Sequence, residues 1–312
     1  MAARKSNASK KLIPAVRYLR YHLTTSGTPG TETSHFIDLS RDLGIVNRRL
    51  YRQGRDYHVK KITIVSSNTP NGDNRISVSV APGSWVTRSA HNRAFKVWQE
   101  QNAIASDNLA GNIAGTWADF KVYLSNDMRT ATLPLPLDNG SNAALMDEWT
   151  YSQMVSPDGT TSADQFYLHL LGDHVGVGAG SWTSVGLVKS YGESRATVSG
   201  GHPYVPGQAS DDPLVNVFDY GTTVDEVVNL LEGDNDYPPY DIDSYPGDDL
   251  NMPKPIVAQD TTIVDGRAVM GSFTALCGLL EFETTSPLVS DVISVLIELA
   301  PGKYRGIKAE SI

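Results

Sequence analysis

The 312-residue chain contains 40% hydrophobic and 20% charged residues, a composition that is typical of globular proteins and excludes a disordered or fibrous chain. Its single cysteine, Cys277, excludes an intramolecular disulfide framework, and no apolar run approaches the length that a membrane span requires. The net charge of −9 is unevenly distributed, since residues 1–61 hold 13 Lys and Arg against 4 Asp and Glu, whereas residues 62–312 hold 13 against 31. This polarity predicts that one basic face or arm meets an anionic partner while the acidic remainder faces solvent.

Residues 1–31 contain six basic side chains and no acidic one, and they lead into the turn-rich stretch "TTSGTPGTETS". Stretches of this composition are typical of flexible linkers, so we predict a basic, flexible N-terminal arm over residues 1–31. Within it, Pro14 is suited to open a short helix. Arg17 and Arg20 interrupt any apolar run, so we expect an unprocessed protein made in the cytosol rather than one with a signal peptide.

From residue 33 onward the chain alternates apolar and polar residues, the pattern of strands with one buried face. The segments "YHVKKITIVSS" (57–67) and "RISVSVAP" (75–82) are separated by a connection containing Asn71 and Gly72, a pair suited to tight turns. We therefore predict a β-hairpin here. The stretch "VNRRLYRQGRDYHVKKITIV" (46–65) holds four arginines and two lysines, so a block of positive charge leads directly into the first of these strands.

A helix is predicted over residues 87–103, "TRSAHNRAFKVWQEQNA", where Ala90, Ala94 and Trp98 recur at helical spacing behind a Thr or Ser cap. A second helix is predicted over residues 222–233. The remaining periodic segments predict short strands, bounded by clusters of Gly, Pro, Asn and Asp, at residues 117–125, 148–156, 164–172, 182–191, 193–200, 267–284 and 290–302.

Many short strands with few helices between them are typical of an all-β fold. We predict a single jelly roll, an antiparallel β-sandwich with one or two short helices in its connecting loops. Strands and helices do not alternate regularly, which disfavours a parallel sheet of the Rossmann type. The shell of this fold is expected to span residues 32–312, interrupted by a long acidic loop inserted at about residues 203–265.

Aspartates concentrate in this predicted loop, and carboxylate oxygens are the ligands that Ca²⁺ prefers. Their spacing does not fit an EF-hand loop, because the glycine and the final glutamate fall in the wrong places. A solvated acidic loop is the first interpretation and a divalent-ion site the second, with the weak candidate ligands Asp241, Asp243, Asp248 and Asp249. No other cofactor is predicted.

His169, Asp173 and His174 lie close together in the sequence. They do not follow a metal-binding spacing such as H-x-x-x-H, and His169 belongs to a predicted strand. A structural role is the first interpretation of all three, and a hydrolase that uses Asp173 and His174 is the alternative. We expect that the protein is not an enzyme.

The basic side chains are the chemical feature that remains. Lys and Arg neutralise phosphates, and a cationic arm can follow a nucleic-acid backbone without reading its sequence. Tyr51 and Tyr57 are interleaved with the second basic segment, where they could stack on bases. A solvated loop or an ion-pairing surface is the other interpretation of that segment. The predicted nucleic-acid-binding residues are Arg4, Lys5, Lys10, Lys11, Arg17, Arg20, Arg48, Arg49, Arg52 and Arg55.

Three strings behind the basic arm carry a family resemblance: "RRLYRQGRDYHVKKITIVSS", "SWVTRSAHNRAFKVWQEQNA" and "IELAPGKYRGIKAESI". Together they resemble capsid (coat) proteins of small circular single-stranded DNA viruses of the CRESS type. The resemblance implies a jelly-roll subunit that self-assembles into a small icosahedral shell, with its long loops outside. It also implies that Arg48, Arg49, Arg52 and Arg55 lie at the inner face or at a subunit boundary, and that the genome faces Arg4, Lys5, Lys10 and Lys11.

The partners that this resemblance implies are further copies of the chain, a single-stranded DNA genome and a host-cell receptor. The implied location is the virion, after synthesis in the host cell and with nuclear import as an open step. An alternative of another class is a sandwich-type carbohydrate-binding module whose acidic loop holds calcium. The residues alone leave open whether segment 48–55 meets a genome or a neighbouring subunit.

Overall fold

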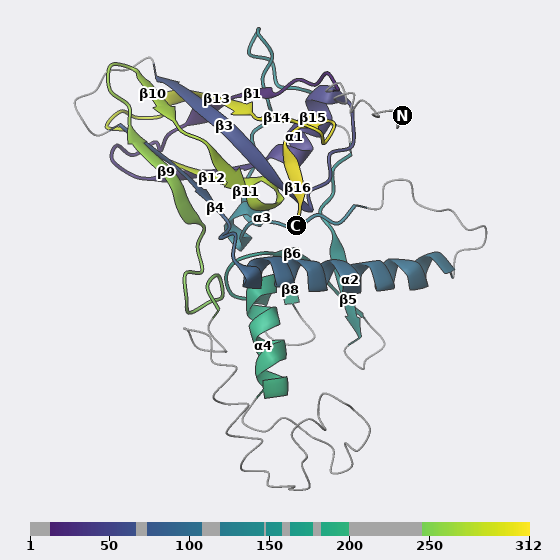
Figure 1. Cartoon of the computed structure of the whole chain (residues 1–312). Coiled ribbons are helices and arrows are strands. Elements are labelled where there is room, and N and C mark those ends of the chain that lie inside the picture. The colour runs from purple at the N-terminus through teal and green to yellow at the C-terminus, as the bar shows by residue number, and fades with distance from the viewer. Residues whose placement is uncertain are drawn as a thin grey trace, which may run out of the picture.

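Two antiparallel β-sheets pack face to face, and a smaller unit with a long helix lies beside them (Figure 1). The predicted antiparallel β-sandwich is therefore confirmed as the main part of the fold. No helix among the described residues is long and apolar enough to cross a membrane. The computed structural model describes residues 13–66, 74–107, 119–146, 148–157, 163–176, 182–199 and 245–312.

The sandwich consists of a six-stranded sheet A and a four-stranded sheet B, and their strands pair in antiparallel fashion. The order in sheet A is β1 (Tyr18–Thr24), β13 (Val292–Leu299), β3 (Arg55–Ser66) and β10 (Arg267–Met270), and β3 also pairs with β11 (Phe273–Ala275) and β16 (Ala309–Ser311). The order in sheet B is β2 (Thr33–Asp38), β12 (Leu279–Thr285), β4 (Arg75–Val80) and β9 (Ile256–Thr262).

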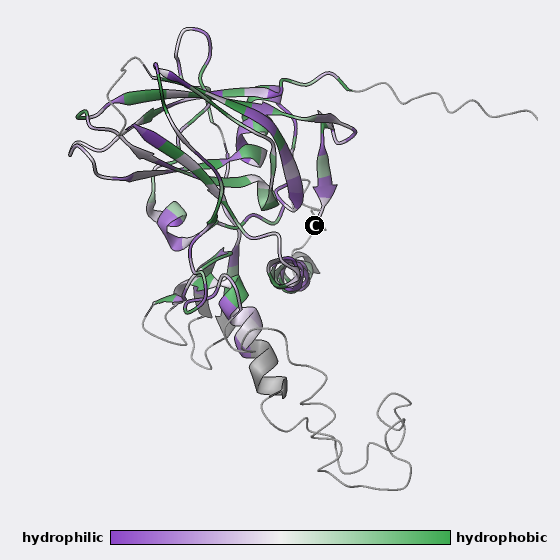
Figure 2. Ribbon diagram, turned by 60° about the vertical axis from the view of Figure 1, so that its left-hand side comes forward, coloured by the Kyte–Doolittle hydropathy of each residue, from purple (hydrophilic) through white to green (hydrophobic). Residues whose placement is uncertain are grey.

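The main core lies between the two sheets. Successive side chains of a strand point to opposite faces of its sheet, so every second side chain points into this core. In β13 the sequence "VISVLIEL" buries Ile293, Val295, Ile297 and Leu299, while the residues between them are exposed or half-buried. Figure 2 shows hydrophobic and hydrophilic residues interspersed along the strands of the sandwich. Burying one such side chain contributes about 1.5–3 kcal/mol, so this core is the main source of stability.

The predicted hairpin between residues 57–67 and 75–82 is wrong. Strand β3 pairs with β13 and β10 in sheet A, whereas β4 pairs with β12 and β9 in sheet B. The alternation located both strands, but it reports only that a strand has one buried face and not which strand lies beside it. Pairing with strands from the C-terminal part gives β3 and β4 neighbours on both sides, which leaves neither as an exposed edge.

The predicted flexible arm extends too far into the chain. Strand β1 pairs with β13 along its whole length, so residues 18–24 belong to sheet A. Every second residue of β1 is fully buried, at Leu19, Tyr21 and Leu23, which is the period of a strand. The short helix predicted to start at Pro14 is therefore wrong. Any arm therefore ends before β1.

Residues 81–255 are inserted between β4 and β9, and the described part of this insertion contains a small sheet with helices around it (Figure 1). This sheet has the order β5-β6-β8-β7, and its β6–β8 pair is parallel. Apolar side chains of the insertion form a second core, which α2 and the small sheet share. The elements of the insertion are α2 (Trp85–Asp107), α3 (Asn126–Thr130), β5 (Gln153–Pro157), β6 (Ala163–His169), β7 (Val175–Gly176), β8 (Trp182–Gly186) and α4 (Leu187–Ser199).

Most elements predicted in this region exist, but they belong to the insertion rather than to the sandwich. The helix predicted over residues 87–103 is confirmed as the central part of α2. The strand predicted over residues 193–200 is wrong, because this stretch continues helix α4. Segment 117–125, where it is described, contributes only an isolated bridge. Strands of the insertion occupy parts of the segments predicted at 148–156, 164–172 and 182–191.

The long loop predicted over residues 203–265 is only part of this insertion. Strand β9 already begins at Ile256, so the end of the predicted loop belongs to sheet B. Residues 200–244, and with them the helix predicted over residues 222–233, lie outside the described residues. The strands of the small sheet carry a pattern like that of the sandwich strands, so the sequence pattern could not separate the insertion from the sandwich.

Short elements at the junctions of the sandwich were not predicted from the sequence. One of them contains Cys277, which is fully buried, as expected for a small apolar side chain, and burial raises the pKa of its thiol. These elements are α1 (Leu39–Asn47), the 3₁₀ turn η1 (Leu276–Gly278), β14 (Pro301–Gly302) and β15 (Gly306–Ile307).

The buried carboxylate of Asp38 joins the sandwich to the insertion. Its Oδ1 accepts hydrogen bonds from Ser40 N at 3.0 Å and Arg41 N at 3.1 Å, which caps helix α1. Its Oδ2 accepts from Gln53 Nε2 at 3.0 Å and from the Tyr151 hydroxyl at 3.2 Å. One side chain thus ties together the end of β2, the segment before β3 and the insertion.

We expect Asp38→Ala to lower the free energy of unfolding by about 3 kcal/mol, because it removes a helix cap and leaves buried donors without an acceptor. Urea unfolding followed by circular dichroism measures this change. Asp138→Ala is the matched control, since Asp138 accepts hydrogen bonds from Asn142 in an exposed loop. The control should unfold close to the wild-type midpoint, and equal losses in both variants would contradict the structural role of Asp38.

Candidate nucleic-acid interface

Two basic segments that are distant in the sequence meet at one end of the sandwich. The stretch of residues 13–17 leads into β1 and runs beside the end of α1. Asn47 Oδ1 accepts from Val16 N at 2.7 Å and Asn47 Nδ2 donates to Val16 O at 3.0 Å, while Arg49 Nη1 donates to Pro14 O at 2.8 Å. The described chain thus begins beside Arg49, and four predicted binding residues precede it outside the described part: Arg4, Lys5, Lys10 and Lys11.

The C-terminal segment brings further basic residues to the same end. Gly306 packs so closely on the N-terminal stretch that a β-carbon there would lie 2.4 Å from a backbone oxygen of that stretch. Arg55 Cζ lies 3.9 Å from the centroid of the Tyr304 ring, and Arg305 Cζ lies 5.8 Å from it. The basic members of this segment are Lys303, Arg305 and Lys308. They lie in a run without acidic residues, although the C-terminal half of the chain is acidic, and this run is the signal that would have identified them in the sequence.

The arginines at this end are held largely by neutral groups. Arg55 Nη1 donates to Ala309 O at 3.4 Å, and Arg305 Nη1 donates to Leu50 O. A backbone carbonyl or an aromatic ring fixes a guanidinium without cancelling its charge, so the region stays positive. We call this region the basic surface and define it by Arg48, Arg49, Arg52, Arg55, Lys303, Arg305 and Lys308.

Two members of the basic surface are among its more exposed side chains. Arg48 ends α1 in the left-handed conformation, with φ 50° and ψ 45°, and is exposed. The side chain of Arg52 is 46% exposed, and its Nη1 lies 3.4 Å from Asp119 Oδ1. Asp119 is buried, so this pair joins a half-exposed guanidinium to a carboxylate in the wall of the adjacent pocket.

Arg17 and Arg20 were predicted to belong to a flexible arm, but the structure places them in or next to sheet A. The carbonyl of Arg17 accepts a hydrogen bond from Leu299 N at 2.9 Å, directly before β1. Arg20 lies on β1, and its Nη2 is 2.9 Å from His22 Nε2. Arg17 therefore borders the basic surface, whereas Arg20 lies further along the strand.

Tyr51 and Tyr57 cannot stack on bases, because both side chains are fully buried. The Tyr51 hydroxyl donates to Arg305 O at 3.0 Å, and the Tyr57 hydroxyl donates to Arg52 O at 2.8 Å. Burial raises the pKa of both phenols above its ordinary value. The two tyrosines anchor the basic surface from inside, and the half-buried Tyr304 is the aromatic side chain that lies against its arginines.

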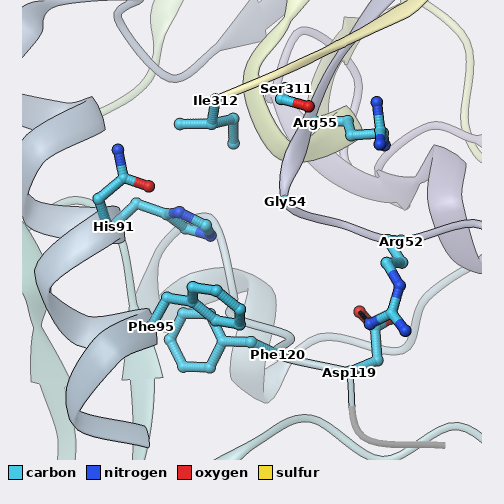
Figure 3. Close-up of a pocket in the computed structure, with 10 residues that line it drawn as sticks. Arg52, Gly54, Arg55, His91, Phe95, Asp119, Phe120, Ser311 and Ile312 are labelled. Carbon is cyan, nitrogen blue, oxygen red and sulfur yellow. Dashed lines mark hydrogen bonds and ion pairs between the residues drawn. The ribbon is translucent and has the colours of Figure 1, made fainter. Parts of the chain in front are cut away.

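A pocket of about 220 Å³ lies between the basic surface and helix α2 (Figure 3). Figure 3 shows His91 and Phe95 extending from α2, with Arg52 and Asp119 on the opposite side and Gly54 between them. Sequence reasoning missed this pocket because its residues come from segments far apart in the chain, and none of those segments has a motif of its own.

Asp248 and Asp249 hold the described end of the acidic loop together. Asp248 Oδ1 accepts from Leu250 N at 2.9 Å and from Asn251 N at 2.7 Å, and Asp249 Oδ2 accepts from Lys189 Nζ at 3.0 Å. Within the described part of the chain, no three His, Cys, Asp or Glu side chains are grouped as metal ligands. Two further candidate ligands lie outside that part, Asp241 and Asp243.

His169 is buried between strands β6 and β8. Its Nδ1 lies 2.6 Å from Ser184 Oγ and its Nε2 lies 2.9 Å from the backbone oxygen of Asp173. Burial lowers the pKa of His169 to about 4, so its ring is neutral near pH 7. The carboxylate of Asp173 pairs instead with Lys189 Nζ at 2.6 Å, and His174 lies beside a carboxylate of α4. Asp173 thus offers His169 its carbonyl and not its carboxylate, which favours the structural interpretation of these residues over a catalytic one.

Comparisons of the chain with protein-family models, with curated proteins and with solved structures give no match. The resemblance of residues 46–103 and 290–312 to viral capsid proteins therefore stays a prediction. The function is therefore inferred from the fold and from the geometry of the basic surface.

We expect Tyr304→Ala to lower the free energy of unfolding by about 2–3 kcal/mol and Tyr304→Phe by about 1 kcal/mol. The Phe variant removes only the hydroxyl that accepts from Arg52 N at 2.9 Å. The Ala variant also removes the ring that Arg55 covers and that meets Tyr51 edge-on at 6.0 Å. Urea unfolding of both variants separates the two contributions, and equal losses would show that the ring contacts contribute little.

Proposed function

We propose that this chain is the structural subunit of a small icosahedral viral shell, that it has a jelly-roll fold, and that its basic surface contacts a single-stranded DNA genome. The order of the strands carries the proposal. Numbered along the chain, the eight long strands of the sandwich follow the order 1-8-3-6 in sheet A and 2-7-4-5 in sheet B. The neighbours 1 and 8, 2 and 7, 3 and 6, and 4 and 5 are the pairs expected of one long hairpin wrapped into two sheets, which supports the proposal of a jelly roll.

The distribution of charge between the sandwich and the insertion supports a shell rather than another use of this fold. Jelly rolls occur in viral capsids and in lectins, so the fold alone does not choose between them. Residues 81–255 hold 8 Lys and Arg against 23 Asp and Glu, whereas the rest of the chain holds 18 against 12. A positive inner face lowers the repulsion between packaged phosphates, and an acidic outer part keeps particles apart in solution. The insertion is therefore assigned to the outside and the basic surface to the inside.

The way in which its arginines are held supports phosphate as the partner of the basic surface. A neighbouring subunit's acidic groups would form fixed ion pairs, whereas a nucleic-acid backbone needs positive charge that is positioned but not neutralised. Arg55 and Arg305 flank the Tyr304 ring and donate to backbone carbonyls. They keep a fixed position and an uncancelled charge, which suits contacts with a backbone of any sequence.

The purified chain is expected to form closed particles, seen by electron microscopy and by elution in the void volume of a sizing column. Deletion of residues 1–12 should leave the particles intact but lower the amount of nucleic acid that co-purifies with them, because it removes four basic residues and stops short of β1. A monomer or small oligomer under all conditions would contradict the shell. Unchanged nucleic-acid content after the deletion would contradict the arm. Deletion of residues 1–31 is unsuitable as a test, because it removes β1 from sheet A.

The double variant Arg48→Gln with Lys303→Gln should weaken binding of single-stranded DNA. The slope of log K against log salt concentration should fall by about 0.7 for each phosphate contact that is lost. Arg75→Gln with Arg267→Gln is the matched control, because Arg267 pairs with Val65 at the opposite end of β3 from Arg55, about 30 Å away by strand geometry. Binding measured over a salt series distinguishes the two pairs, and an equal loss of slope in both would contradict a localised interface.

A further inference from the structure

His91, in the pocket beside the basic surface, has no hydrogen-bond partner for its ring within the described part of the chain. Only 3% of the residue is exposed, and neither ring nitrogen has a partner among the described residues. Burial lowers the pKa of His91 to about 4, so near pH 7 its neutral ring presents one N–H donor and one acceptor nitrogen. Folded proteins rarely leave a buried polar group without a partner, because nothing then offsets its desolvation. His91 therefore marks a place where a ligand would supply the missing hydrogen bonds.

Asp119 supplies a second unsatisfied group on the opposite side of the pocket. Its Oδ1 lies 3.4 Å from Arg52 Nη1, whereas its buried Oδ2 has no hydrogen-bond partner within the described chain. Burial raises the pKa of Asp119 to about 6, so at pH 7 it is still mainly a carboxylate that can only accept. A fitting ligand donates toward Asp119 and offers both a donor and an acceptor toward His91.

Aromatic rings form another side of the pocket. The centroids of Phe95 and Phe120 lie 5.8 Å apart, and the Phe120 ring meets the His91 ring at 5.4 Å and 62°. Such walls favour a flat ring over a puckered one. Arg52 and Arg55 line the side that faces the basic surface, as Figure 3 shows. Asp119 disfavours an anion inside the pocket while the arginines favour one at its edge, so the ligand combines an uncharged flat ring with an attached anionic group.

We infer that this pocket binds one nucleobase of a single-stranded nucleic acid, with the phosphate of the same nucleotide toward Arg52 and Arg55. The inference rests on the proposed function, since a strand that follows the basic surface passes the pocket. The carboxylate of Asp119 accepts N–H groups, which favours bases with an exocyclic amino group, such as cytosine, over thymine. The interface would then prefer such a base at this one position and bind the rest of the strand independently of its sequence.

Equilibrium dialysis of the full-length protein against mononucleotides tests the pocket without requiring a genome. Deoxycytidine monophosphate is expected to bind about tenfold more tightly than thymidine monophosphate, the scale of discrimination that a good base-edge contact provides. Deoxyribose 5-phosphate, which lacks a base, and inorganic phosphate should both bind more weakly still. Equal binding of deoxycytidine monophosphate and deoxyribose 5-phosphate would overturn the inference, because it would show that only phosphate is recognised.

Two variants separate the pocket from the basic surface. His91→Phe keeps an aromatic ring but removes both nitrogens, and Gly54→Val narrows the pocket, since a β-carbon on Gly54 would lie 3.5 Å from His91 Cε1 in ordinary contact. Each should lower the affinity for deoxycytidine monophosphate about tenfold and leave that for inorganic phosphate unchanged. His22→Phe is the matched control, because His22 lies on β1 and not beside the pocket. Wild-type affinity in both pocket variants would overturn the inference.

The outcome also distinguishes this inference from the proposed function. Particles that retain DNA but do not discriminate between mononucleotides would leave the shell standing and remove the base pocket. Discrimination between mononucleotides by a protein that never assembles would support the pocket and remove the shell. If His91→Phe fails to fold, Gly54→Val decides, and Gly54→Ala accompanies it because a β-carbon at this position meets the imidazole at an ordinary contact distance.

Discussion

The carboxylate of Asp38 is the constraint on which the arrangement of the basic surface depends. It ends β2, caps α1 and holds Gln53, whose amide also pairs with the backbone of Val122 in the insertion through bonds of 2.9 and 2.6 Å. Gln53 lies within the basic segment, directly after Arg52, and is fully buried. Because this neutral side chain is fixed in the interior, the backbone on either side of it is fixed as well, and the neighbouring arginine is directed outward. The uncharged Gln53 thus fixes the position of the basic surface.

Buried and exposed charges follow opposite rules in this molecule. In the interior, Arg41 Nε donates to Asp42 Oδ1 at 2.7 Å and the Tyr21 hydroxyl donates to Asp42 Oδ2 at 2.6 Å, since breaking such a pair would leave a buried charge uncompensated at a cost of about 3–5 kcal/mol. On the basic surface, Arg55 and Arg305 are held by carbonyls and by an aromatic ring. An exposed ion pair contributes only about 0–1 kcal/mol, so little stability is lost by leaving these arginines without a carboxylate. What the surface gains is positive charge that remains available to a partner.

Pattern in the sequence predicted strands and the long helix but not their neighbours. Period-two alternation located β3, β4 and β13 because it reports burial of one face, yet it could not show that β3 and β4 lie in different sheets. Charge located the segment of residues 48–55, but the burial of Tyr51 and Tyr57 depends on the C-terminal segment, more than two hundred residues away, where Tyr51 bonds to Arg305 and Tyr57 pairs with Ala309. The pocket could not be predicted at all, since His91 and Asp119 line one pocket only because α2 packs beside the start of β3, where Arg88 pairs with Asp56. Each residue alone resembles an ordinary polar residue.

Strand order explains why three basic segments meet. Strands β1 and β13 are antiparallel, so the beginning of β1 at Tyr18 lies opposite Glu298 near the end of β13. Strand β3 also runs antiparallel to β13, with Val59 opposite Leu299, so its beginning lies at the same end of the sheet. The chain before β1, the segment before β3 and the chain after β13 must therefore leave or join sheet A together. The described start of the chain, residues 48–55 and residues 303–308 are therefore separated in sequence but not in space. The basic surface is thus a consequence of topology, because the strand order brings segments that are distant in the sequence to one end of sheet A.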